Sequence, residues 1–258
     1  MIDLRLNRHI LMNSACATLS GDCDCKICLG YSIHSRTKHG DIKGNLVRET
    51  GFKRNVCRKY ITLCGDISEL QYFDCSTITS IGGIFYNIPD ITGVEGWDTS
   101  NVTYMDGLFW NNTAISDISA LANWNTSKVT WMEGLFQGCN NLTDLTPLAN
   151  WDVSNCTAIW FGDLPEITSL HGLENWVSHN LDQVEIANCP KLTDISAVAN
   201  WDVSRVTYFN WCFHSNTSLA NLHGMENWDV SNVTSMYNAF GDCVKLADIS
   251  ALANWRPS

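Results

Sequence analysis

Two histidine–glutamate pairs are the most enzyme-like residues in this chain of 258 residues. His171 stands three residues before Glu174, and His223 stands three residues before Glu226. Such a pair could act as a general base with its orienting carboxylate, but no serine or cysteine nucleophile stands at one offset from both. Both pairs lie in one recurring phrase, His-Gly-x-Glu-Asn-Trp. We therefore interpret them as parts of a repeat, and we expect a protein that is not an enzyme and that uses no cofactor.

The N-terminal cysteines form the other set of residues with possible chemistry. Cys25 and Cys28 are spaced Cys-x-x-Cys, and Cys57 and Cys64 follow them. These thiols could bind zinc tetrahedrally, although the gap between Cys57 and Cys64 is longer than the usual spacing of paired ligands. Disulfides in an exported protein and free thiols are the alternatives. The sequence leaves all three open.

Charge divides the chain near residue 65. Residues 1–65 carry 11 basic and 5 acidic side chains, and residues 66–258 carry 5 basic and 22 acidic ones, so the net charges are +6 and −17. An acidic array repels nucleic acid, so we expect it to have no nucleic-acid partner, whereas the basic part could bind a polyanion. No stretch approaches the roughly 20 apolar residues of a membrane span. The apolar run at residues 10–17 is a poor signal peptide, because Asn13 interrupts it.

A tryptophan returns every 25 to 27 residues through the rest of the chain. Each one stands in a version of Asn-Trp-Asp-Val-Ser, at positions Trp97, Trp124, Trp151, Trp176, Trp201, Trp228 and Trp255. A degenerate earlier copy covers residues 73–85. This period predicts a solenoid, which we place at residues 61–258 after an irregular N-terminal segment or cap at residues 1–60.

Each predicted coil joins an Leu-x-x-Leu-x-x-Leu segment, the tryptophan, and the unit Val-Thr-x-Met-x-x-x-Phe. β-Branched residues in Val-Thr-x-Met predict a short strand, and the residues leading to phenylalanine predict a helical or 3₁₀ turn. No coil can bury its apolar face alone, so we expect seven to eight coils to stack, with parallel strands about 4.8 Å apart. Leucine, tryptophan and phenylalanine form the predicted core.

The phrase Asn-Trp-Asp-Val-Ser-Asn-Val-Thr-Ser-Met at residues 227–236 resembles the BspA-type leucine-rich repeat. This is the form found in bacterial surface proteins with 26-residue repeats, and the resemblance covers about residues 61–258. It implies an α/β leucine-rich-repeat solenoid, a location on the cell surface or outside the cell, and binding or adhesion in place of catalysis. The basic, cysteine-containing N-terminal segment departs from the family pattern.

The candidate ligand-binding residues vary within the fixed frame of the repeat. Three coils have an aromatic residue, favoured in interfaces, at the x of Val-Thr-x-Met: Tyr104, Trp131 and Tyr208. Four coils have an aspartate before an isoleucine or leucine: Asp117, Asp144, Asp194 and Asp248. The alternation of a strand predicts that these aspartates form an exposed row. The row could attract cations, or it could only keep the protein soluble.

Asparagine or cysteine recurs where the next coil begins, at Asn112, Cys139, Cys189, Asn216 and Cys243. A small polar side chain there can bond the backbone of a neighbouring loop, so we predict a structural ladder. We expect no disulfides among the array cysteines, because they fall in different coils with irregular spacing.

These patterns favour a non-catalytic module that binds a protein or a glycan through the solenoid surface. The alternative is a zinc-binding or polyanion-binding N-terminal segment, with the repeat array as its scaffold. The final residues follow directly after Trp255 without an evident polar capping repeat. Because an uncapped solenoid end exposes apolar surface, end-to-end self-association is a further expectation.

Overall fold

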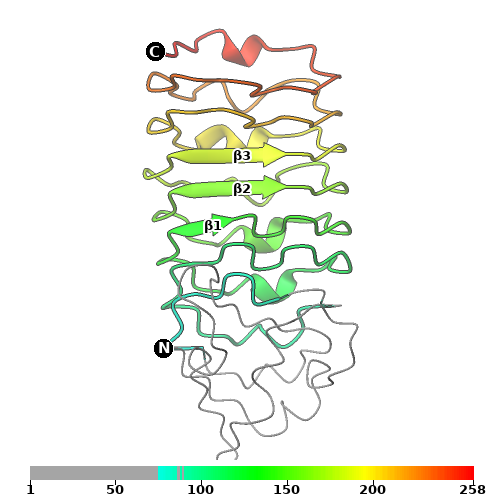
Figure 1. Cartoon of the computed structure of the whole chain (residues 1–258), viewed down its shortest axis with the longest axis vertical. Helices are drawn as coiled ribbons and strands as arrows, with labels where there is room; N and C mark the ends of the chain where they lie inside the picture. Colours follow the sequence, from blue (N-terminus) through cyan, green and yellow to red (C-terminus); the bar gives the residue numbers. More distant parts are fainter. Residues whose placement is uncertain (1–74, 86–87, 89) are drawn as a thin grey trace, which may run out of the picture.

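The computed structural model describes residues 75–85, 88 and 90–258. In this part the chain winds into coils that stack along one long axis, with the C-terminal coil at one end (Figure 1). The candidate metal ligands Cys25, Cys28, Cys57 and Cys64 lie outside the described residues, as does the segment at residues 1–60. The predicted zinc or polyanion site therefore stays a prediction.

A parallel sheet of three strands runs through the middle of the stack, in the order β1 (Trp131–Glu133), β2 (Ala158–Gly162) and β3 (Gln183–Ala187). Trp131 pairs with Ala158, and Ala158 pairs with Gln183. Single bridges between Ser80 and Tyr104, between Tyr104 and Trp131, and between Tyr208 and Ser235 add further parallel pairings at the same position of the repeat. The parallel strand that Val-Thr-x-Met predicts is confirmed, and it begins at the x of that phrase.

The threonine of Val-Thr-x-Met strengthens this ladder. In Thr130 both the backbone nitrogen and the hydroxyl donate to the carbonyl of Thr103, at 2.9 and 3.1 Å. Thr157 repeats both contacts with Thr130, at 3.0 and 3.2 Å. Thr103 and Thr234 make the same two bonds, so in four coils the repeated threonine joins its coil to the one before it by two hydrogen bonds.

Strands β2 and β3 are the longest because their coils are two residues shorter. In the longer coils a left-handed residue stands three positions after the x, as at Gly107 (φ 56°), Gly134 (φ 62°) and Trp211 (φ 63°). A left-handed residue ends the extended backbone and also prevents a helix. In the shorter coils the buried Phe161 and Ile186 stand at this position and the strand continues.

Four of the described coils have a helical turn on another part of the coil. These turns are the 3₁₀ helices η4 (Ser119–Leu121), η5 (Thr146–Leu148), η6 (Ser196–Asn200) and η7 (Ser250–Leu252). The prediction of a helical turn between methionine and phenylalanine was wrong, because the left-handed residue interrupts that segment. The α part of the predicted α/β class also needs correction, since every helix in the described residues is a 3₁₀ helix and none is an α-helix. Helical segments of three to five residues are too short for a stable α-helix.

Stacked aromatic rings fill the core, as predicted. All seven repeat tryptophans are buried. The rings of Trp97, Trp124, Trp151 and Trp176 stack in sequence with centroids 5.9, 6.3 and 6.2 Å apart. A second rank stacks at 5.1, 5.4 and 6.4 Å and consists of Phe85, Phe109, Phe136 and Phe161. This continuous core buries what one coil could not bury alone.

The predicted ladder of asparagine and cysteine is also confirmed. Buried Asn216 accepts a hydrogen bond from the Cys189 nitrogen at 2.9 Å and donates to the carbonyls of Ile186 and Phe213 at 2.7 and 2.9 Å. In the next coil the Cys243 thiol donates to the same Phe213 carbonyl at 3.1 Å. From residue 75 onward the six cysteines are buried free thiols, so no disulfide links the described coils.

Candidate binding surface

One outward surface, here called the outer sheet face, follows from the alternation of side chains along the strands. In β1 the side chains of Trp131 and Glu133 point outward, whereas Met132 is buried between them. The first column of the face is the x of Val-Thr-x-Met in successive coils, of which only Ala158 is buried: Tyr104, Trp131, Ala158, Gln183, Tyr208 and Ser235. The second column stands two residues later, where Glu133, Trp160 and Glu185 pair in the sheet and Asp106, Asn210 and Tyr237 hold the same offset in their coils.

The three aromatic residues that the sequence singles out all lie in the first column. Tyr104 is half-buried, and its hydroxyl donates to Asp106 Oδ2 at 3.2 Å. A Cβ at Gly82 would lie 3.2 Å from Tyr104 Cδ1, so the phenol ring leans over that glycine of the preceding coil. Trp131 is half-buried, whereas Tyr208 is 62% exposed. The repeat therefore presents these rings on one side of the solenoid.

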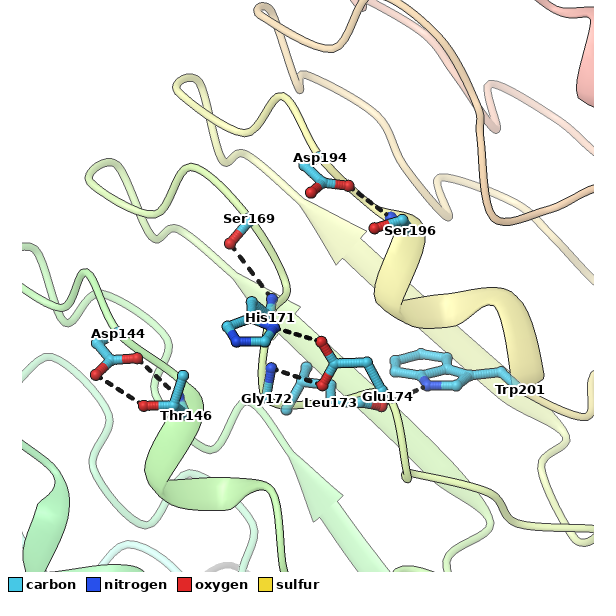
Figure 2. Close-up of polar contacts among 10 residues, drawn as sticks. All are labelled: Asp144, Thr146, Ser169, His171, Gly172, Leu173, Glu174, Asp194, Ser196 and Trp201. Atoms are coloured by element: carbon cyan, nitrogen blue, oxygen red, sulfur yellow. Dashed lines mark hydrogen bonds and ion pairs between the residues drawn. The ribbon is translucent and has the colours of Figure 1, made fainter.

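The four predicted aspartates are exposed, but they lie apart from the outer sheet face. Each accepts a hydrogen bond from the backbone nitrogen two residues later, where a 3₁₀ helix begins; the four lengths are 2.8 Å at Asp117 and Asp144 and 2.9 Å at Asp194 and Asp248. Figure 2 shows this turn at Asp144 and Asp194. The bond from the Ser196 backbone lowers the pKa of Asp194. These carboxylates thus have a structural task, and the structure does not bring them to the aromatic residues.

The histidine–glutamate pairs also have a structural task (Figure 2). Glu174 Oε2 accepts a hydrogen bond from the Gly172 nitrogen at 2.9 Å, and its Oε1 lies 2.5 Å from His171 Nδ1. Gly172 has φ 104°, and a Cβ there would lie 2.6 Å from the Leu145 carbonyl oxygen, so the turn requires glycine. In another coil Glu95 accepts from the Gly93 nitrogen in the same way at 2.8 Å, and there the residue before the glycine is Thr92 in place of a histidine. The glutamate therefore holds the turn with or without a histidine.

Several residues of the outer sheet face were not predicted from the sequence. Trp211 is 41% exposed and meets Tyr237, which is 67% exposed, edge to face with centroids 5.5 Å apart. Its other neighbour is His214, at 5.1 Å. Trp160 stands in the second column, where β1 and β3 place Glu133 and Glu185 on either side of it. For Trp160 and Tyr237 the available signal was the position two residues after the x, which alternation also turns outward; Trp211 stands three residues after the x in a left-handed conformation, which alternation does not predict.

The electrostatics of the outer sheet face centre on Glu185. This side chain is half-buried, and burial raises the pKa of its carboxyl. The charges of Glu133 and Asp163 raise the pKa further, whereas His214 lowers it. Negative charge and aromatic surface therefore occur together on this face. Among the described residues no group of histidine, cysteine, aspartate and glutamate is arranged to hold a metal ion.

Comparison with known proteins places the repeat array in a family. The model of DUF285, described as "Mycoplasma protein of unknown function", matches residues 57–176 and 180–258. The chain belongs to the DUF285 family. The two matched parts of this DUF285 protein meet just after Trp176, between the two shorter coils. The finer BspA form of the repeat stays a prediction.

The DUF285 protein is also similar to a solved structure, an internalin C2 from Listeria monocytogenes strain 4b F2365. The two are 21% identical over 70% of this chain and 81% of that chain, with a TM-score of 0.37. A search of curated proteins finds no match. In the part of the chain that the structure describes, no helix is long and apolar enough to cross a membrane.

Proposed function

We propose that this DUF285 protein is a non-catalytic module that binds a protein or a glycan through the outer sheet face. The observation that carries the proposal is the clustering of exposed aromatic residues. Of the four aromatic side chains that are largely exposed in the described part, Tyr208, Trp211 and Tyr237 lie together on this face. Clustered exposed aromatic side chains are typical of interaction sites, where tyrosine and tryptophan contribute most of the binding energy.

Hydrogen bonds fix the backbone that presents Trp211 and Tyr237 before any ligand arrives. The Trp211 nitrogen donates to the Tyr237 carbonyl at 3.1 Å, and Asn210 Oδ1 accepts from the Tyr237 nitrogen at 2.8 Å. The Ser235 hydroxyl also donates to Asn210 Oδ1, at 2.6 Å. A rigid surface loses little conformational entropy on binding, which favours affinity.

The side chains elsewhere that could take part in catalysis, the histidine–glutamate pairs and the cysteines, have structural roles, which supports binding over catalysis. Glu174 and Glu226 each hold a glycine turn, and their second carboxylate oxygens contact His171 and His223. Burial raises the pKa of the Cys139 thiol to about 12, so this cysteine is not a thiolate nucleophile at neutral pH.

Binding to a glycan array and to a peptide array, measured with the full chain, tests this proposal. One variant combines Tyr208→Ser, Trp211→Asn and Tyr237→Ser. Asparagine suits position 211 because Asn238 takes the same left-handed conformation in the next coil (φ 56°). A matched variant removes exposed apolar side chains elsewhere, by Trp110→Ser, Val244→Ser and Ile249→Ser.

We expect the first variant to lose the signals of the wild-type protein and the matched variant to keep them, with both folded by circular dichroism. Signals that survive in the first variant, or that disappear equally in both, would overturn the proposal. A location on the cell surface belongs to the same proposal and is supported by the resemblance of the repeat. Protease treatment of intact cells tests it, because a surface protein is cleaved before the cells are lysed.

A further inference from the structure

We infer that the outer sheet face binds a basic segment of a partner protein, with a lysine or arginine side chain over Trp160 between Glu133 and Glu185. The inference rests on the proposed function and deepens it by naming the chemistry of the ligand. It follows from the register of the sheet, the position of the Trp160 ring, and the distribution of charge.

The register places an aromatic ring between two carboxylates. Glu133 pairs with Trp160, and Trp160 pairs with Glu185, so the three outward side chains stand on consecutive rungs. Rungs of a sheet are about 4.8 Å apart. A cation over the indole is therefore within reach of both carboxylates, which combines a cation–π contact with charge-assisted hydrogen bonds.

Gly162 gives the Trp160 ring its position. A Cβ at residue 162 would lie 3.1 Å from Trp160 Nε1, so the indole leans along its own strand over the glycine. The side chain of Trp160 is half-buried, which means that part of its surface contacts solvent. A ring supported in this way along the sheet resembles the flat platform on which a guanidinium or ammonium group is bound.

The charges around Trp160 favour a cationic ligand over a neutral one. Burial and the charges of Glu133 and Asp163 both disfavour the ionised form of Glu185. A ligand cation would offset this repulsion. His214 has the opposite effect on the pKa of Glu185, and the centroid of its ring lies 5.1 Å from that of Trp211.

The columns of the outer sheet face contain no lysine or arginine in the described part of the chain. Basic side chains bind at other places: Lys128 Nζ donates to Asn101 Oδ1 at 2.7 Å, and Lys191 pairs with Glu166 at 2.6 Å. Residues 66–258 carry 22 acidic and 5 basic side chains, a net charge of −17. Both the local surface and the whole array therefore complement a basic partner.

Fluorescence anisotropy with two labelled peptides tests the inference on the full chain. The first probe is a ten-residue peptide of alternating arginine and serine. The second replaces each arginine by citrulline, which keeps the shape of the side chain and removes its charge. We expect the arginine peptide to bind about tenfold or more tightly than the citrulline peptide, and its binding to weaken as sodium chloride rises.

Variants locate the binding site. We expect Trp160→Thr and Glu185→Gln each to weaken binding of the arginine peptide by about fivefold to tenfold. Glu185→Gln keeps the shape of the side chain, so it tests the inference even if Trp160→Thr unfolds. The matched control is Asp144→Asn, which removes one negative charge elsewhere. Asparagine keeps the side-chain oxygen that accepts from the Thr146 nitrogen at 2.8 Å, so we expect this variant to bind like the wild type.

Three results would overturn the inference. The first is no binding of the arginine peptide, and the second is equally tight binding of the citrulline peptide. The third is a loss of binding in Asp144→Asn as large as that in Glu185→Gln. A neutral glycan or peptide that still requires Tyr208, Trp211 and Tyr237 would then leave the proposed function in place. If no array ligand depends on those three residues either, both proposals are wrong.

Discussion

The indole nitrogen of Trp151 donates a hydrogen bond of 2.9 Å to the carbonyl of Leu121, 30 residues earlier in the chain. The same ring stacks between those of Trp124 and Trp176. Corresponding bonds of 2.9 to 3.1 Å run from the indoles of Trp124, Trp176, Trp201, Trp228 and Trp255 to carbonyls 28 to 30 residues earlier. The repeat tryptophan thus fills the core and also gives a second donor to a carbonyl that already accepts a backbone N–H, as Leu121 does from the Trp124 nitrogen at 3.1 Å.

We predict that Trp151→Ala lowers the free energy of unfolding by about 3–5 kcal/mol, because it leaves a large cavity in the core. Trp151→Phe keeps much of the buried surface and removes only the indole bond to the Leu121 carbonyl, which still accepts from the Trp124 nitrogen, so we expect the lost bond to cost about 0.5–1.5 kcal/mol. Urea denaturation measures both values. Trp110→Ala is the control and should change stability little, since this side chain is 54% exposed. Wild-type stability in Trp151→Ala would contradict the stacked core.

Replacement of Asn216 should be unusually costly for a polar residue. Its side chain makes one accepted and two donated hydrogen bonds to buried backbone groups of two coils. Asn216→Ala removes the partners of the Cys189 nitrogen and the Ile186 carbonyl, whereas the Phe213 carbonyl keeps the Cys243 thiol, and we predict a loss of about 2–4 kcal/mol. Asn216→Cys should lose less, because Cys243 at the same position still donates to a carbonyl. Thermal denaturation of both variants measures the two losses of stability. Equal losses in Asn216→Ala and Asn216→Cys would contradict a stabilising thiol–carbonyl bond at this position.

Acid should weaken a contact between two coils. His179 Nδ1 lies 2.5 Å from Asp202 Oδ2, and this hydrogen bond lowers the pKa of the Asp202 carboxyl from 3.8 to about 2. Because the pKa of the folded state is the lower one, the stabilisation is complete above about pH 4 and is lost as the pH falls toward 2. We expect the melting temperature of Asp202→Asn to fall less steeply than that of the wild type over this range. Parallel curves would rule out this contribution.

The thiols of the array should resist modification while the protein is folded. Burial raises the pKa of Cys139, Cys156 and Cys189 to about 12. Since the thiolate is the reactive form, N-ethylmaleimide at pH 8 should label these three positions only after denaturation. Mass spectrometry of digested samples, with and without guanidinium chloride, measures labelling at each position. Rapid labelling of Cys189 in native buffer would contradict its burial.

Local patterns were sufficient to predict the solenoid and its inner ranks. The period of Trp97, Trp124 and Trp151 identified the buried anchors, because a residue that repeats once per coil occupies the same place in every coil. The place of Asn216 in the repeat likewise predicted its bond to a neighbouring loop. Such features need only the order of residues within one coil, and the coil is encoded by consecutive residues.

The binding surface required the tertiary structure. Asp144 and Asp194 looked like an exposed row of ligands, but their carboxylates hold the turns that begin 3₁₀ helices. Trp160 looked like one more aromatic residue, and only the register places it between Glu133 and Glu185, 27 residues before and 25 residues after it.

The sequence of this protein alone therefore determined the repeat, its core and the direction of its strands. The tertiary structure decided which outward residues become neighbours. The physical reason is that neighbours on a solenoid surface come from different coils. Small differences in coil length change which side chains meet, and so do left-handed residues such as Trp211 at φ 63°.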